Sequence, residues 1–159
     1  MQDVTVRMLT TPAERSHACA RIIEALPDWL GQPDANRAYI AAVANCETFG
    51  AEHAGEIVGA LALRSFFTHT ADIYWLGILP DYHRCRIGTH LVTGAIEHAT
   101  CAGHRWMVVE TLSPRSADEH YARTRRFYEA MGFEPLLEHR ADDPVNPMMW
   151  MIKPLSQIW

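Results

Sequence analysis

A strand, a basic turn and a helix follow one another without a break in residues 71–92, ADIYWLGILPDYHRCRIGTHLV. Its first nine residues, Ala71 to Leu79, are rich in β-branched, aromatic and aliphatic side chains, which predicts a strand of a largely buried sheet. Pro80 ends that strand. From Ile87 onward, apolar residues recur at helical spacing. The rest of the chain must be arranged around this strand, loop and helix.

The basic loop has the features of an anion-binding site. The start of a helix leaves several backbone N–H groups pointing one way, and the positive end of the helix dipole lies there too. The side chains of His83, Arg84 and Arg86 add cations where that dipole disfavours them. A phosphate or pyrophosphate is therefore the expected ligand, and Gly88 allows the backbone to approach it. The alternative is a solvated charged loop.

Composition limits the classes of protein that need to be considered. The chain has 159 residues, 48% of them hydrophobic, enough for a single domain over residues 1–159. A formal net charge of −5 argues against a general nucleic-acid binder. The four cysteines form no CxxC pair or zinc spacing, and no leader or membrane-length apolar run is found. We expect a cytoplasmic protein without a metal or a membrane partner.

The first half of the chain alternates helix and strand signals. Thr11 to Glu14 is a capping-box pattern with Pro12 at the first helical position. Strands that follow one another around the Ala54-Gly55 turn predict an antiparallel meander into residues 71–79. The expected elements are a strand at Val4–Leu9, a helix from Pro12 to Pro27, a helix at Asn36–Cys46, and strands at Thr48–His53 and Glu56–Phe66.

The second half closes the sheet. The run WMVVETL predicts a strand over residues 104–112, which Ser113-Pro114 breaks. Ser116 to Glu119 is a second capping-box pattern, which predicts a helix to about Met131 with Gly132 as its stop. Residues 133–139 and 147–153 are the last expected strands, separated by a loop.

The basic loop resembles the cofactor-binding motif of the GNAT superfamily, the acetyl-CoA-dependent N-acetyltransferases. That motif is Gln or Arg, two residues, Gly, one residue, then Gly or Ala, and here it falls on His83 to Gly88. His83 stands at the Gln or Arg position, and Arg86 replaces the first glycine. Arg86 therefore needs a backbone conformation without positive φ, or bears a modest strain.

A second motif carries the same resemblance. Residues 125–133, RRFYEAMGF, are similar to the FYE-x-x-GF end of GNAT domains. The resemblance implies an α/β (α+β) GNAT fold: a central mixed, mostly antiparallel sheet of about six to seven strands flanked by about four helices. It also implies acetyl-CoA as co-substrate and no metal. The cofactor-contacting residues that it implies are Leu76, Gly77, Ile78, His83, Arg84, Cys85, Arg86, Ile87, Gly88, Thr89, Tyr121 and Thr124.

Within this second motif, Tyr128 matches the tyrosine that family members commonly use as a general acid. A phenol suits that role, because coenzyme A leaves as a thiolate that a nearby hydroxyl can protonate. The alternative is a core aromatic whose hydroxyl binds the backbone. Tyr121 stands where the family often has an asparagine that contacts the cofactor.

The general base is harder to assign. An amine acceptor has a lysine-like pKa of about 10.4, so a group or a water chain must take a proton before attack. Asp72 matches the position of the catalytic glutamate in the histone-acetylating members, one methylene shorter. Glu110 is an alternative, since a carboxylate within an apolar strand needs a purpose or a partner. His69 and His53 have weaker grounds.

Together these features predict an N-acetyltransferase that moves the acetyl group of acetyl-CoA to a primary amine of a small molecule, by direct attack in a ternary complex. The alternatives are a protein or aminoacyl-tRNA acetyltransferase and a non-catalytic acyl-CoA-binding module. The resemblance places the early helices beside the acceptor, with Trp29 and Tyr39 as contacts or core residues. Trp150 and Trp159 could supply the interface of a homodimer.

Overall fold

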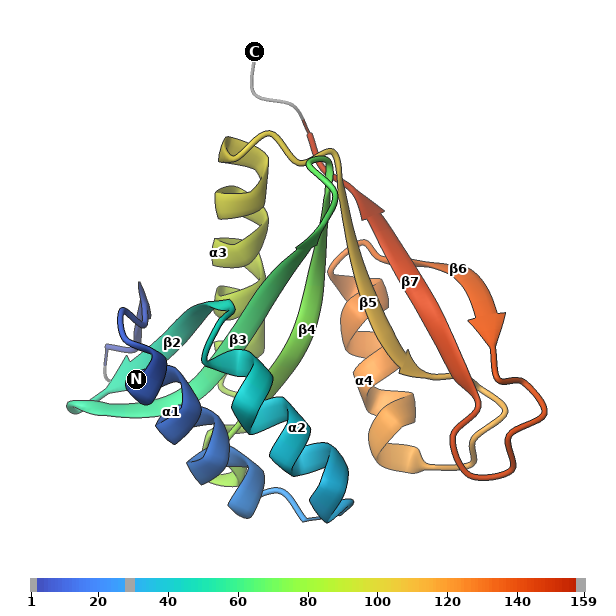
Figure 1. Ribbon diagram of the computed structural model, residues 1–159, viewed down its shortest axis with the longest axis horizontal. Coiled ribbons are helices and arrows are strands. Elements are labelled where there is room, and N and C mark those ends of the chain that lie inside the picture. The colour runs from blue at the N-terminus through green and yellow to red at the C-terminus, as the bar shows by residue number, and fades with distance from the viewer. Residues whose placement is uncertain (1–2, 28–30, 157–159) are drawn as a thin grey trace. The chain divides into compact units, whose positions relative to one another are not determined.

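The computed structural model describes residues 3–27 and 31–156, in which seven strands form one mixed sheet and four α-helices accompany it (Figure 1). The strand order is β1-β2-β3-β4-β5-β7-β6. This confirms the expected fold class. The elements are β1 (Thr5–Met8), α1 (Pro12–Glu24), α2 (Pro33–Val43), β2 (Glu47–His53), β3 (Glu56–Phe66), β4 (Thr70–Ile78), the 3-10 turn η1 (Pro80–Tyr82), α3 (Ile87–Cys101), β5 (Trp106–Leu112), α4 (Glu119–Ala130), β6 (Glu134–His139) and β7 (Met148–Pro154).

The chain divides into two compact units. The first unit comprises Met1–Arg64 and Tyr74–His98, and the second comprises Ser65–Ile73 and Ala99–Trp159. Strand β4 contributes residues to both. Within the described residues no helix combines the length and apolar character needed to cross a membrane.

Helices α1 and α2 of the first unit bury their apolar sides in one cluster with β3 and β4. Cys19, Ile22, Val43 and Trp75 all belong to this cluster, as the apolar stripe of α1 predicted. The predicted bounds of α2 were wrong by three residues at each end. The helix starts at Pro33, whose fixed φ suits the first helical position, and ends before the chain enters β2.

Close backbone approach brings α3 onto the sheet of the first unit. A Cβ added at Gly59 would lie 3.0 Å from a methyl carbon of Ile87 and 3.3 Å from Leu91. A larger residue at position 59 would therefore push the start of α3 away from β3. This contact fixes where the basic loop must end.

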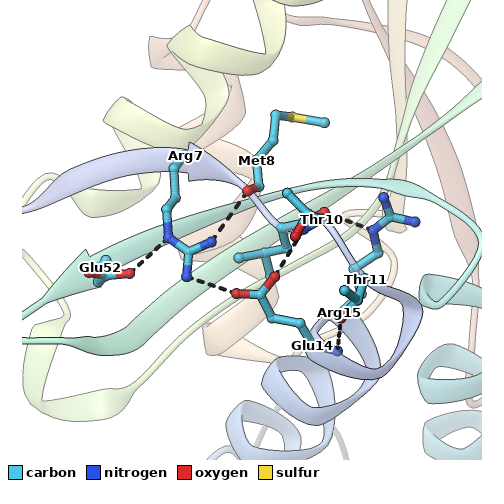
Figure 2. Close-up of polar contacts among 8 residues, drawn as sticks. Arg7, Met8, Thr10, Thr11, Glu14, Arg15 and Glu52 are labelled. Atoms are coloured by element: carbon cyan, nitrogen blue, oxygen red, sulfur yellow. Dashed lines mark hydrogen bonds and ion pairs between the residues drawn. The ribbon is translucent and has the colours of Figure 1, made fainter.

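A polar cluster holds the beginning of α1 against β1 and β2 (Figure 2). The hydroxyl of Thr11 accepts a hydrogen bond from the N–H of Glu14 at 3.1 Å, and the Glu14 carboxylate accepts one from the N–H of Thr10 at 2.9 Å. Arg7 donates to Glu14 and to Glu52, both at 2.8 Å. The predicted cap is confirmed, with a three-residue ion-pair bridge that the sequence did not reveal.

Replacing Glu14 with glutamine should lower the melting temperature at neutral pH by a few degrees. The hydrogen bonds from Arg7 and then from Thr10 lower the pKa of Glu14 in the folded state, so the stability it contributes is present at neutral pH. That contribution, about 0.5–1 kcal/mol for a part-exposed pair, is lost as the pH falls below the ordinary glutamate value of about 4.3. The measurement is thermal unfolding of both proteins from pH 7 to pH 2.5. Glu24→Gln, at the exposed end of the same helix, is the control and should change little at any pH.

The second unit is built on β5, which is parallel to β4 and antiparallel to β7, with β6 outermost. Met107 faces Lys153 across β5 and β7, and the Lys153 ammonium lies 2.5 Å from the position of a Cβ added at Gly132, just after the end of α4. Helix α4 therefore covers the face that carries Met107 and Lys153. Side chains on the opposite face alternate with these and include Glu110 and Trp150.

The ends of α4 confirm one prediction and correct another. Gly132 follows the helix with φ +90°, the left-handed conformation that only glycine adopts freely. The predicted N-cap at Ser116 is wrong: the Asp118 carboxylate accepts from the N–H groups of His120 and Tyr121, at 2.8 and 3.3 Å. Asp118 is the N-cap because its carboxylate accepts hydrogen bonds from two of the free N–H groups at once.

Candidate active site

The basic loop of the first unit connects β4 to α3 through two residues in the left-handed region. After η1, His83 is extended, and Arg84 and Arg86 have φ of 64° and 63°. The backbone at Arg86 thus keeps the conformation that a glycine would adopt, and this residue bears the strain. An L-residue in that region costs about 1–2 kcal/mol, which the surrounding structure must offset.

His83 and Tyr82 fix this loop to its own unit. The Nε2 of His83 lies 2.8 Å from the carbonyl oxygen of Ile78. Because a carbonyl can only accept, that nitrogen carries the hydrogen. The Tyr82 hydroxyl pairs with Nδ1 of His53 at 3.0 Å, so His53 is already engaged in holding the loop. The first contact spans five positions, and the second joins β2 to the loop across 29 positions.

The backbone at the start of α3 presents several N–H groups without an acceptor in the described part of the chain. They belong to Arg84, Arg86, Ile87, Gly88 and Thr89, and the first helical bond runs from the His90 N–H to the Arg86 carbonyl at 3.0 Å. The two arginines are exposed, and no carboxylate of residues 3–27 or 31–156 pairs with either. Left-handed residues beside a helix start form a concave set of N–H groups suited to an anion.

Replacing Arg86 with glycine should stabilise the protein. Glycine adopts a φ of 63° without strain, although it loses more entropy on folding, so the net gain should be about 1 kcal/mol. For a chain of this size that is a rise of about 2–4 °C in melting temperature, measurable by calorimetry. The control is Arg123→Gly at an exposed position within α4, which should lose about 1 kcal/mol. A loss at both positions would contradict the assigned backbone strain.

The second unit holds Tyr128, the predicted acid, in a buried setting. Only 4% of this residue is exposed, and its ring packs against Phe127 and Phe133 with centroids 5.2 and 5.5 Å apart. Burial raises the pKa of the Tyr128 hydroxyl above its ordinary value, and the negative charge of Asp72 and the neighbouring Tyr121 raise it further. The phenol is therefore protonated throughout the neutral range.

Asp72, Tyr121 and Thr124 are brought to the same unit as Tyr128. Asp72 is 1% exposed and is paired in register with Val108 on β5. The negative charge of Asp72 is the second cause, after burial, of the raised pKa of Tyr128. The Thr124 hydroxyl donates to the His120 carbonyl at 3.1 Å, which leaves its oxygen able to accept. Three of these four residues lie on one helix, as their spacing predicted.

An arginine that sequence reasoning did not single out anchors this helix. The guanidinium of Arg125 donates to the carbonyls of Leu112 and Ser113, at 2.8 and 3.2 Å, at the end of β5. These bonds set the position of α4, and therefore of Tyr128, relative to that strand. Only its place within the FYE-type motif could have drawn attention to it.

The other base candidates have partners or lie apart. A Glu110 carboxylate oxygen lies 3.1 Å from Nε2 of His139, so the partner expected for a carboxylate in this strand is present. His69 stacks on Phe67 at the β3–β4 turn, with centroids 6.0 Å apart.

Among the aromatic residues predicted to contact the acceptor, Tyr39 packs on Tyr74 against the core of the first unit. The predictions for Trp29 and Trp159 lie outside the described residues.

Strand order, the loop before α3 and the buried tyrosine of α4 define an acyltransferase of the acetyltransferase class. A family model described as an acetyltransferase (GNAT) domain matches residues 44–135, more than half of the chain. The chain belongs to the GNAT acetyltransferase family, as its two motifs predicted.

Solved structures of low sequence identity share this fold. An acetyltransferase assigned to the GNAT family from Desulfovibrio desulfuricans is 20% identical, with TM-score 0.82 over 97% of this chain and 100% of that one. The ribosomal-protein-S18-alanine N-acetyltransferase from Escherichia coli is 17% identical, with TM-score 0.79 over 99% and 97%. An aminoglycoside 6'-N-acetyltransferase complexed with coenzyme A is 16% identical, with TM-score 0.74 over 98% and 99%. No curated protein sequence matches significantly.

Proposed function

We propose that this protein transfers the acetyl group of acetyl-CoA to a primary amine of a small molecule, by direct attack in a ternary complex. The observation that supports it most is the set of N–H groups at the start of α3, beside two arginines that no described carboxylate neutralises. A diphosphate has the charge and the acceptor oxygens that such a set requires. The similar aminoglycoside acetyltransferase was solved with coenzyme A.

In the first unit, the proposed contacts with the cofactor come from the basic loop and from the end of β4. In the first unit the N–H groups of residues 84–89 hold the diphosphate, and Leu76, Gly77 and Ile78 line the end of β4 that leads to them. His83 holds the loop to Ile78 and acts as a positioning residue. In the second unit the half-buried Tyr121 and Thr124 offer polar groups to the cofactor from α4.

Tyr128 is the proposed general acid. Acetyl-CoA supplies a thioester, and its sulfur leaves as a thiolate that needs a proton or a hydrogen bond. A phenol whose pKa is held above its ordinary value keeps that proton available while the acceptor amine loses its own. The buried surroundings of Tyr128 also strengthen any hydrogen bond that it donates.

Asp72 is the proposed base, directly or through water. Because its carboxylate is nearly inaccessible, the acceptor's proton would pass to it along a chain of water molecules. Its negative charge has a second consequence, because it disfavours ionisation of Tyr128. Glu110 is the alternative base, since its side chain is 36% exposed.

A thiol-release assay tests the proposal. Polyamines, aminoglycosides, amino acids and peptides are mixed with acetyl-CoA and the enzyme, and the appearance of free thiol is followed. We expect at least one small amine to accelerate release well above hydrolysis. Turnover only with peptides or aminoacyl-tRNA would favour a macromolecular acceptor. The net charge of −5 argues against tRNA as that acceptor. Tight coenzyme A binding without any turnover would indicate a non-catalytic binding module.

A further inference from the structure

The face of the second unit opposite α4 carries an aromatic surface with a carboxylate in it. We call it the open face and define it by Phe66, Trp106, Glu110, His139 and Trp150. Strand register places Glu110 opposite Trp150, and His139 opposite Met148. Figure 1 shows β5, β7 and β6 side by side, in agreement with their pairing. Phe66 and Trp106 are 37% and 39% exposed.

Trp150 is the centre of this surface. The Phe66 ring meets it edge-on, with centroids 6.0 Å apart, and the His139 ring stacks on it at 6.3 Å and 24°. His139 also lies 3.1 Å from the Glu110 carboxylate. The histidine ring therefore lies beside both the indole and the carboxylate, and Glu110 keeps 36% of its side chain exposed beside the rings.

The charge of this face has one sign. Glu110 lies on it, and register adds Glu134 opposite Ile152. The side chains that β5, β6 and β7 present on this face in the described registers include neither lysine nor arginine, since Lys153 points to the α4 side. Carboxylates next to aromatic ring faces favour an organic cation over an anion or a neutral apolar group.

We propose that the open face binds a second ammonium group of the acceptor, so that the preferred substrates are diamines or polyamines rather than monoamines. This inference rests on the proposed acetyl transfer to an amine. Asp72 and Glu110 lie on adjacent strands, two residues apart in register, so their Cα atoms are about 8 Å apart. The two ammonium groups of a short diaminoalkane span a comparable length. One would occupy the Glu110 and Trp150 surface while the other reacts.

The test compares two amines that differ only in the second charge, cadaverine and pentylamine. In the wild-type enzyme kcat/KM should be about tenfold higher for cadaverine, the combined effect of one part-exposed ion pair and one cation–π contact. Glu110→Gln should remove that preference by raising KM for cadaverine about tenfold more than KM for pentylamine. A base at Glu110 would instead slow both amines through kcat.

Glu134→Gln is the matched control, a carboxylate on the same face whose register partner on β7 is Ile152 and not Trp150. It should change the ratio less than twofold, and melting curves verify that both variants are folded. Equal kcat/KM for the two amines in the wild type, or equal losses in both variants, would overturn the proposal. Assembly of a homodimer through Trp150, seen by sedimentation and abolished by Glu110→Gln, would assign the face to a second copy and overturn it too.

Binding without turnover separates this inference from the proposed function. Isothermal calorimetry with cadaverine and pentylamine needs no chemistry. If thiol release fails for every amine, the acetyltransferase proposal falls, and calorimetry still decides the open face. If turnover occurs without a preference for the dication, only the inference about the open face falls.

Discussion

Tyr128→Phe should reduce kcat by about one to three orders of magnitude while leaving the KM for acetyl-CoA nearly unchanged. The substitution removes one hydroxyl from a ring that is 4% exposed and packed between Phe127 and Phe133, so the ring contacts remain. The loss should fall on kcat because the proton is needed only as the thiolate departs. Steady-state kinetics with a saturating amine measures it.

The pH dependence of kcat gives an independent reading of the same residue. Because burial and the Asp72 charge raise the pKa of Tyr128, the acid form should persist beyond the ordinary phenol pKa of about 10. Activity should therefore show no alkaline decline from this group below that pH. Asp72→Asn removes the negative charge that raises the pKa of Tyr128. The pKa of Tyr128 should therefore move downward, and the alkaline decline in kcat should begin at a lower pH than in the wild type.

Tyr74→Phe is the control for loss of a hydroxyl. Tyr74 is a half-buried tyrosine that packs on Tyr39 in the first unit, and its ring also contacts the guanidinium of Arg64. Its replacement should change kcat less than threefold. A Tyr128→Phe enzyme with full activity would show that Tyr128 is a core aromatic, the alternative that its burial leaves open.

The sequence predicted well those elements whose signals are local. The stripe of α1 and its Thr11 cap depend on neighbours within four residues, and so does the stop at Gly132. The bounds of α2 failed because Pro33 is as good a first helical residue as any in that run. Ser116 was chosen as a cap by its spacing, whereas Asp118 receives two N–H groups.

The candidate site was predicted less completely because its contacts join distant parts of the chain. Spacing placed Tyr121, Thr124 and Tyr128 on one helix face. It could not show that Asp72, on a strand more than fifty positions earlier, acts electrostatically on Tyr128. The contacts of His139 with Glu110 and of His53 with Tyr82 have no sequence signal either. The left-handed backbone at Arg84 has no sequence signal, because among the amino acids it is glycine that indicates such a conformation.

Reversing the charges of Arg84 and Arg86 to glutamate should weaken coenzyme A binding by about ten- to a hundredfold. Both side chains are exposed at the positive end of α3, and neither has a carboxylate partner among the described residues. Their charges therefore act on whatever anion binds the loop. Calorimetric titration with coenzyme A gives the dissociation constants, and raising the salt concentration should shrink the difference between the proteins.

Pantetheine, which lacks the nucleotide and its diphosphate, is the ligand control, and Arg123→Glu on the exposed side of α4 is the protein control. Neither comparison should show a loss. An equal loss with pantetheine would place the effect outside the diphosphate contacts and remove the main support for the proposed function. A second double variant, Arg84→Ala with Arg86→Ala, should weaken binding less than the glutamate pair. It removes the two charges without adding negative ones, and the N–H groups of Ile87, Gly88 and Thr89 are unchanged in both variants. If the two pairs are equally weak, the arginine side chains, and not the backbone of the loop, hold the anion.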